Sequence, residues 1–86
     1  MEIYELRYFL AVARHENIHR AAEELRISPG SLSKSVARLE SELDVKLFAR
    51  VGRNIRLNDH GELLRQRALD IIELEENTKS ELFARK

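Results

Sequence analysis

The sequence predicts a mainly α-helical fold, a winged helix-turn-helix of three helices plus a two-stranded wing, followed by a long linker and dimerisation helix. Three observations lead to this prediction. Apolar residues recur at helical spacing along most of the chain, two short alternating segments flank a glycine at residue 52, and basic side chains gather in the middle third. We expect residues 1–58 to form the winged domain and residues 59–86 to form the long helix.

Length and composition limit what the chain can be. Its 86 residues suit one small domain, and 43% hydrophobic residues suit a packed core rather than a disordered segment. Cysteine is absent, so no disulfide and no thiolate metal site is expected. No apolar run is long enough to cross a bilayer and no signal-peptide pattern opens the chain, so we expect a soluble, cytoplasmic protein without a membrane partner.

The net charge is zero, from 15 basic and 15 acidic residues, and this balance argues mildly against a nucleic-acid partner. The charges are unevenly distributed, however. Residues 26–56 carry seven basic side chains against three acidic ones, whereas residues 1–25 and 57–86 each have two more acidic than basic side chains. Because attraction to phosphate is local over about a Debye length, the middle third can still attract it.

Residues 3–14 are predicted to form the first helix, which has two apolar stripes. The first stripe, expected to face the chain's own core, comprises Ile3, Leu6, Phe9, Leu10 and Ala13. The second stripe comprises Tyr4, Tyr8, Ala11 and Val12. Because a helix with two apolar faces needs two partners, we expect Tyr4, Tyr8 and Val12 to contact a second protomer; singly exposed tyrosines are the alternative.

Two helices joined by a tight turn are predicted next. Asn17 is the expected N-cap of a helix over residues 18–25, and Ser28 followed by Pro29 predicts the start of a helix that runs to about Leu43. One face of this helix is apolar: Leu32, Val36, Leu39 and Leu43. The opposite face is small and basic: Gly30, Lys34, Ala37, Arg38 and Ser41. Such a thin polar face can enter the major groove of double-stranded DNA.

Residues 45–50 and 54–57 are predicted to form two short strands, because apolar residues alternate in both. Phe48 breaks the alternation and is expected to pack from the other side of its strand. Gly52 permits a tight turn between the strands. The hairpin carries Arg50, Arg53 and Arg56, which suits contact with phosphates or with a minor groove; a solvated sheet edge is the alternative.

Asn58 and Asp59 predict the start of a helix over residues 59–86, roughly 42 Å long. A 4-3-4-3-4 spacing, typical of a coiled-coil seam, is formed by Leu64, Ala68, Ile71, Glu75, Thr78 and Leu82. The favourable i,i+4 pairs are Glu75 with Lys79 and Glu81 with Arg85. Because the chain has no other obvious domain to cover this seam, we predict a symmetric homodimer that uses Leu64, Ala68, Ile71 and Leu82.

Over residues 3–65 the chain resembles the N-terminal domain of LysR-type transcriptional regulators. The residues that carry the resemblance are Leu6, Phe9, Val12, Ala13, Ala21, Ala22, Leu25, Ser28, Leu32, Ser33, Lys34, Val36, Leu39, Glu40, the segment Leu47-Phe48-Ala49-Arg50, Leu57 and Gly61. The resemblance implies a sequence-specific DNA-binding domain of a bacterial transcription regulator. It also implies that a dimer binds an inverted-repeat operator, with the third helix in the major groove and the wing toward the minor groove.

The resemblance further implies which residues meet DNA. The predicted set is Asn17, His19, Arg20, Ser28, Pro29, Gly30, Ser31, Ser33, Lys34, Arg38, Arg50 and Arg53. Pro29 stands where the family commonly has glutamine, so a side chain able to read adenine is missing there. Family members carry a larger ligand-binding domain after the long helix. A small-molecule effector is therefore expected to act only through a domain absent from this chain, and the homodimer can extend to a higher oligomer in the full-length protein.

Other classes of function have little support in the sequence. His15, His19 and His60 lack metal-ligand spacing, so we expect no metal site and no cofactor. No nucleophile–base pair and no phosphate-cradling glycine loop is present, so we expect no enzyme. One alternative stays open, a winged-helix module used for protein–protein interaction, and the near-neutral net charge is the feature that favours it.

Overall fold

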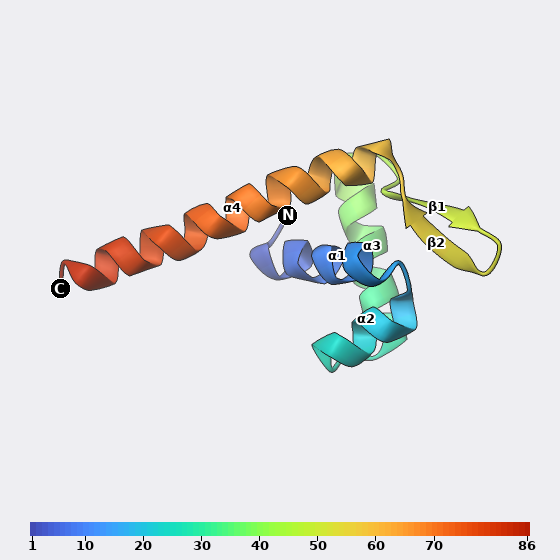
Figure 1. The fold of residues 1–86 in the computed structure, drawn as a ribbon, viewed down its shortest axis with the longest axis horizontal. Coiled ribbons are helices and arrows are strands. Elements are labelled where there is room, and N and C mark those ends of the chain that lie inside the picture. The colour runs from blue at the N-terminus through green and yellow to red at the C-terminus, as the bar shows by residue number, and fades with distance from the viewer.

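The computed structural model describes residues 1–86. Its elements are α1 (Ile3–His15), α2 (Ile18–Leu25), α3 (Pro29–Leu43), β1 (Phe48–Val51), β2 (Asn54–Leu57) and α4 (Asp59–Ala84). In Figure 1 the first three helices form a body, the β1–β2 hairpin projects from one side, and α4 crosses the body and runs out beyond it to the C-terminus. The predicted winged helix-turn-helix with a long final helix is therefore confirmed, and the molecule is elongated, with extents of 51 × 26 × 19 Å.

Side-chain caps begin three of the helices, as the sequence predicts. The side chains of Asn17, Ser28 and Asn58 each accept a hydrogen bond from the backbone N–H three residues further on, at 2.9, 3.1 and 2.8 Å. Each bond satisfies one of the helix's free N–H groups, and Pro29 occupies the first turn of α3, where a missing N–H has no cost. The starts of α2, α3 and α4 are thus fixed locally by the sequence.

Three connections use a left-handed residue that is not glycine. Glu16, Arg26 and Asp44 follow α1, α2 and α3 with φ angles of 49°, 58° and 57°. The N–H of each donates to a carbonyl near the end of the preceding helix, which ends that helix sharply. The Arg26 turn keeps α2 and α3 close together, and this is the turn of the helix-turn-helix.

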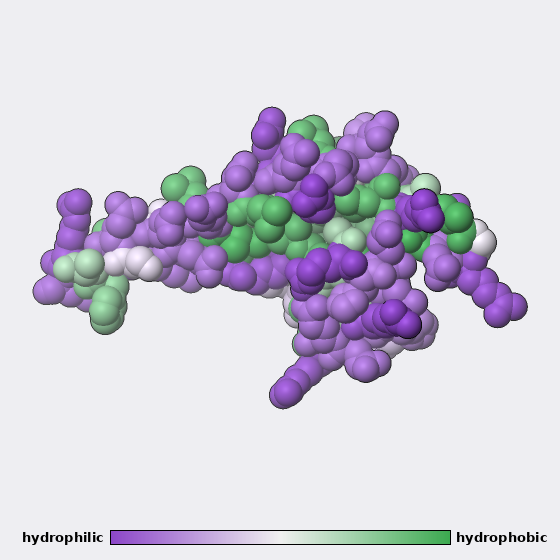
Figure 2. Space-filling view, viewed as in Figure 1, coloured by the Kyte–Doolittle hydropathy of each residue, from purple (hydrophilic) through white to green (hydrophobic).

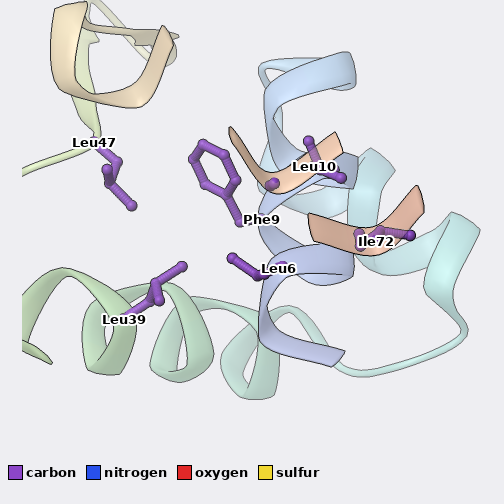
Figure 3. Close-up of a cluster of buried hydrophobic side chains, with 7 residues drawn as sticks. Leu6, Phe9, Leu10, Leu39, Leu47 and Ile72 are labelled. Carbon is purple, nitrogen blue, oxygen red and sulfur yellow. The ribbon is translucent and has the colours of Figure 1, made fainter. Parts of the chain in front are cut away.

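One apolar cluster joins α1 to α3, α4 and the segment before the wing. Its buried members are Leu6, Phe9, Leu10, Leu39, Leu47, Ala68 and Ile72. Figure 3 shows the labelled side chains converging from these elements, with Phe9 between Leu47 and α1's other apolar residues. The first half of α4 is therefore part of the domain's core.

A second cluster joins α1, α2 and α3, and it comprises Ala11, Val12, Ala21, Ala22, Leu32 and Val36. Phe48 packs against both clusters, and its ring centroid lies 5.6 Å from that of Phe9. The sequence predicts only that Phe48 packs from the other side of its strand, and the two clusters are what it packs against. The wing is therefore attached to the core by an aromatic side chain at its base.

Gly61 marks the place where α4 passes against the base of the wing. A Cβ built at this position would overlap the Leu47 carbonyl oxygen and would lie 2.6 Å from Leu57 Cδ1. Only glycine allows this close approach, so Gly61 fixes where α4 starts relative to the hairpin.

Several predicted boundaries are wrong: α1 ends at His15 rather than at residue 14, β1 ends at Val51 rather than at residue 50, and two others differ by more than one residue. The first strand was expected to begin at residue 45, but β1 begins at Phe48. The Val45 N–H donates to the Glu40 carbonyl and the Leu47 N–H donates to the Glu40 side chain, so both N–H groups are bound to α3 rather than to β2. The final helix ends at Ala84 rather than at residue 86, which leaves Arg85 outside it as the C-cap.

Two residues of the predicted dimer interface are buried inside the chain. Val12 and Ala68 are both 0% exposed, so neither can offer surface to a partner. Val12 is buried against α2 and α3 in the second cluster, and Ala68 is buried because α1 of the same chain covers the first half of the α4 seam. Leu64 and Ile71 are accordingly half-buried against the first cluster. An Arg7–Glu75 ion pair of 3.7 Å closes the α1–α4 contact.

Candidate nucleic-acid interface

The exposed face of α3 is small, polar and basic. Ser33, Lys34, Ala37 and Arg38 are all exposed, while Leu32, Val36 and Leu39 point into the two clusters. This division follows the predicted one. A helix that is well packed on one side and carries only short or flexible polar side chains on the other can approach the floor of a major groove.

The N-terminal tip of α3 offers few free polar groups. The Ser28 hydroxyl donates to the Ser31 hydroxyl at 2.8 Å while it accepts the Ser31 N–H, so the helix cap occupies it. Pro29 and Gly30 are exposed beside it, and a Cβ at Gly30 would meet nothing within 4 Å. The exposed surface of the α3 tip is therefore mainly the Gly30 backbone and the Pro29 ring.

The register of the hairpin separates two of its arginines. Arg50 pairs with Ile55 and Ala49 pairs with Arg56 across the antiparallel ladder. Because side chains alternate between the two faces of a strand pair, Arg50 and Arg56 project from opposite faces. Arg53 lies at the exposed tip beside Gly52, whose φ of 64° makes the tight turn.

A groove of about 410 Å³ separates α3 from one face of the wing. Its lining includes Ser33 and Ala37 from α3, and Phe48, Arg50 and Ile55 from the hairpin. The groove brings the recognition face of α3 and Arg50 to a single surface, although they are far apart in the sequence.

A second groove, of about 400 Å³, lies between the start of α2 and the other face of the wing. Asn17 and Arg20 line it from the α2 side, and Arg56 lines it from β2. Arg56 is outside the set of DNA contacts predicted from the sequence. The register places Arg56 on the face opposite Arg50, but its place in this groove also depends on where the wing docks on the body.

The structure leaves most of the predicted contact residues accessible. The exposed ones are His19, Arg20, Ser28, Pro29, Gly30, Ser31, Ser33, Lys34, Arg38, Arg50 and Arg53. Asn17 is half-buried, and its side-chain oxygen is used to cap α2. All of them lie on α3, on the first turn of α2, at the caps that precede these two helices or on the wing.

An ion cluster links the end of α1 to α2 beside this surface. Glu24 accepts from His15 Nε2 at 2.8 Å and also pairs with Arg14. The hydrogen bond from His15 is the main cause that lowers the pKa of Glu24 from its usual 4.5, and the charge of Arg14 adds to it. Glu24 is therefore held as a carboxylate and is neutralised by its neighbours.

Apolar side chains are also exposed, and most of the large ones are spread along α4: Leu63, Leu69, Leu74, Leu82 and Phe83. Leu82 is 62% exposed and Phe83 is 74% exposed, and Figure 2 shows apolar surface at the free end of α4. Tyr4 on α1 is 47% exposed and meets Tyr8 edge to face, with ring centroids 5.4 Å apart. Tyr8 itself is half-buried against the second cluster.

The structure offers little for other kinds of site. Nowhere do three or more histidine, cysteine or acidic side chains come together as a metal would require. None of the helices is long and apolar enough to cross a membrane.

A three-helix core with a tight α2–α3 turn, an exposed basic face on α3 and a two-stranded hairpin define a winged helix-turn-helix domain. The family model described as "Bacterial regulatory helix-turn-helix protein, lysR family" matches residues 3–62. The chain belongs to this family.

Relatives and solved structures agree with the family assignment. The chain is 46% identical over 86 residues to the hca operon transcriptional activator HcaR of Escherichia coli, covering all of this chain and 28% of that protein. It is 39% identical over 84 residues to the uncharacterized HTH-type transcriptional regulator YybE of Bacillus subtilis, covering 98% of this chain and 29% of that protein. The chain therefore spans less than a third of the length of these two relatives.

Solved structures similar to this chain include complexes with DNA. The DNA-binding domain of CbnR in complex with DNA matches with a TM-score of 0.93 and 33% identity, covering 98% of this chain and 97% of that one. The DNA-binding domain of BenM with benA site 1 DNA matches with a TM-score of 0.94 and 29% identity over the whole of both chains. The likeness includes α4 as well as the winged body, because nearly every residue is covered.

Proposed function

We propose that this chain is the operator-reading domain of a bacterial transcription regulator, with α3 in the major groove and the wing toward the adjacent minor groove. The observation that carries the proposal is the groove beside α3, where Ser33 and Arg50 share one surface. The family assignment and the DNA complexes of similar domains support it. A protein of this class works as a binding module rather than as an enzyme.

The proposed contacts fall into two kinds. Ser33, Lys34 and Arg38 on α3 are placed to reach base edges, because they stand on its exposed face. The remaining residues position the protein on phosphates or at the α3 tip: Asn17, His19, Arg20, Ser28, Pro29, Gly30, Ser31, Arg50 and, at the wing tip, Arg53. To these we add Arg56, which lines the α2 groove together with Arg20.

The zero net charge does not oppose this proposal. The exposed basic side chains of α3 and the wing belong to the middle third of the sequence, where basic residues outnumber acidic ones, while the acidic excess belongs to the two ends. At physiological ionic strength charges further apart than about 8 Å are largely screened, so a phosphate responds to the local surface rather than to the whole chain.

A titration of duplex DNA at several salt concentrations tests the proposal. Sites first selected from random duplexes would supply the preferred sequence, and the logarithm of the affinity should fall linearly with the logarithm of salt concentration. Lys34→Ala should weaken the preferred site by about 1–3 kcal/mol if Lys34 contacts a base. A protein that selects no sequence, and whose weak binding survives both Lys34→Ala and Arg38→Ala, would instead be a protein–protein interaction module.

We further propose that the chain binds an inverted repeat as a homodimer, or as a higher oligomer in the full-length protein. The interface is a revised one, built on Leu82, Phe83 and Tyr4, which leave large apolar surfaces in water. Leu64, Ile71 and Tyr8 can contribute only their half-exposed edges. A two-fold axis would repeat α3 about one helical turn away on the duplex.

Sedimentation at micromolar concentration tests the dimer. Binding to a full inverted repeat should be much tighter than binding to one half-site, because two linked contacts act together. A clean monomer that binds both duplexes equally well would overturn this part of the proposal. The relatives are longer than this chain, and we propose that any small-molecule effector acts through the part outside it, in the cytoplasm.

A further inference from the structure

Two carboxylates hold the base of the wing from opposite sides. Glu40, on α3, accepts the backbone N–H of Leu47 at 2.7 Å through Oε2. Glu16, in the α1–α2 turn, accepts the backbone N–H of Leu57 at 3.1 Å through Oε2. Leu47 lies just before β1, and Leu57 ends β2, where it pairs with Phe48. The two bonds therefore hold the two ends of the hairpin where the hairpin joins the body.

Each carboxylate also lies on an element that carries proposed DNA contacts. Glu40 follows Ser33 by two turns of α3, and its side chain is only 13% exposed. Glu16 directly precedes Asn17, the residue that caps α2. Because one bond runs from α3 and the other from the turn that precedes α2, together they fix how far the wing lies from both helices.

These positions are electrostatically unfavourable for a surface that attracts phosphate. Glu40 lines the groove that holds Arg50, and Glu16 lines the groove that holds Arg20 and Arg56. A carboxylate there opposes the attraction of its neighbouring arginines. Removing either carboxylate, however, would leave a half-buried backbone N–H without its acceptor, which is costly. At Glu16 and Glu40 the hydrogen bond to the wing therefore matters more than the unfavourable charge.

We propose that Glu16 and Glu40 are positioning residues that set the number of base pairs between the sequence read by α3 and the flank contacted by the wing tip. Neither residue contacts DNA. They act through Leu57 and Leu47 on the hairpin, and so on the place where Arg53 meets the duplex. This inference rests on the proposed DNA-binding function.

The test uses duplexes that hold the selected half-site constant and move an A/T-rich tract away from it one base pair at a time. The wild-type protein should prefer one spacing over its neighbours by about fivefold or more, comparable to the cost of one mismatched base pair. Glu40→Ala and Glu16→Ala should bind all spacings alike. Glu40→Gln and Glu16→Gln should keep the wild-type preference, because the amide oxygen can still accept the N–H, and should bind slightly tighter at every spacing, because a negative charge is removed.

Three controls make the result decisive. Glu81→Ala removes an exposed carboxylate from the far end of α4 and should leave the preference unchanged. Glu40→Asp keeps the charge but shortens the side chain, so it should weaken or shift the preference even if an alanine variant fails to fold. Hydrogen exchange at the Leu47 and Leu57 amides should be faster in the Ala variants than in the Gln variants.

The inference is overturned if the wild type has no spacing preference, if the Ala or Asp variants keep it, or if the Gln variants lose it as the Ala variants do. Each of these outcomes is independent of whether the protein binds the half-site, which the same titrations measure directly. A failure of the positioning role is therefore distinguishable from a failure of the proposed function.

Discussion

The two halves of α4 share one 4-3 spacing, which is apolar in the first half and polar at Glu75 and Thr78 in the second, and they have opposite surroundings. The seam that runs from Leu64 through Ala68 to Ile71 lies against α1, and Ala68 is fully buried. The same seam continues to Leu82, which is 62% exposed beyond the body. A heptad spacing therefore shows that a helix has an apolar side but does not show whether that side belongs to its own chain or to a partner.

The wing, like α4, has one part packed on the body and one part exposed. Its base is attached through Phe48, which packs on both clusters, while its tip at Gly52 and Arg53 is exposed. Both projections of the molecule thus have an anchored base and a free end. We expect the bases to determine stability and the free ends to determine binding.

The largest effect is expected from the anchored half of α4. Ile72→Ala removes a side chain that is 8% exposed in the first cluster and should lower the free energy of unfolding by about 2–5 kcal/mol. Leu82→Ala, the matched control in the free half, should change it by no more than about 0.5 kcal/mol at concentrations where the chain is a monomer. Urea denaturation measures both. Equal losses would mean that the free half of α4 also packs within the chain.

The free end of α4 should affect association. Leu82→Glu should weaken the homodimer by about 1.5–3 kcal/mol if Leu82 becomes buried in it, with no loss of monomer stability. Ile71→Glu is a poorer probe, since Ile71 also packs on the first cluster and its loss would disturb the fold. Sedimentation equilibrium measures the dimer, and an unchanged dimer constant would move the interface away from the end of α4.

The sequence predicted where the helices start better than it predicted how the helices pack against one another. Asn17, Ser28 and Asn58 cap α2, α3 and α4 because capping is a local interaction that three or four residues decide. Val12 and Ala68 were misplaced because their burial depends on which helix folds over α1, and periodicity carries no information about that. The start of β1 was misplaced for the same reason, since Glu40 holds Val45 and Leu47 from another element.

Part of the proposed DNA-binding surface could be predicted from local sequence patterns, and part depends on how distant segments pack. The small basic face of α3 could be read from helical spacing alone. The pairing of Arg56 with the α2 groove depends on the hairpin register and on where the wing docks, which no local pattern specifies. The sequence therefore predicts Arg56 only as one of three hairpin arginines suited to phosphates or a minor groove, without placing it beside α2.

The wing offers a smaller effect with an internal control. Arg53→Ala should cost about 1 kcal/mol more on duplexes with A/T-rich flanks than on duplexes with G/C-rich flanks, because a narrow minor groove has an enhanced negative potential. Arg56→Ala, on the hairpin's α2-facing side, should weaken both duplexes equally and should reduce the salt dependence by about one charge. Competition titrations measure both variants, and a reversal of the two behaviours would assign the minor-groove contact to Arg56.

The smallest effect is expected where α1 is tied to α2 at an exposed site. The pKa of Glu24 is lowered from 4.5, first by the hydrogen bond from His15 and then by the charge of Arg14. A carboxyl group whose pKa is lower in the folded state stabilises the fold above its unfolded pKa, and that contribution is lost as the pH falls through the folded value. The wild type should therefore lose more stability below pH 4.5 than Glu24→Gln does.

Solvent weakens this contribution, because the side chain of Glu24 is 40% exposed and its partner Arg14 is 58% exposed. Denaturation midpoints measured from neutral pH to well below 4.5 would detect the difference. Glu81→Gln, which removes an exposed carboxyl group from the free end of α4, should follow the wild-type curve. If Glu24→Gln also follows it, the ion cluster contributes nothing to the α1–α2 junction, and the anchoring of α2 rests on its apolar contacts and the Asn17 cap alone.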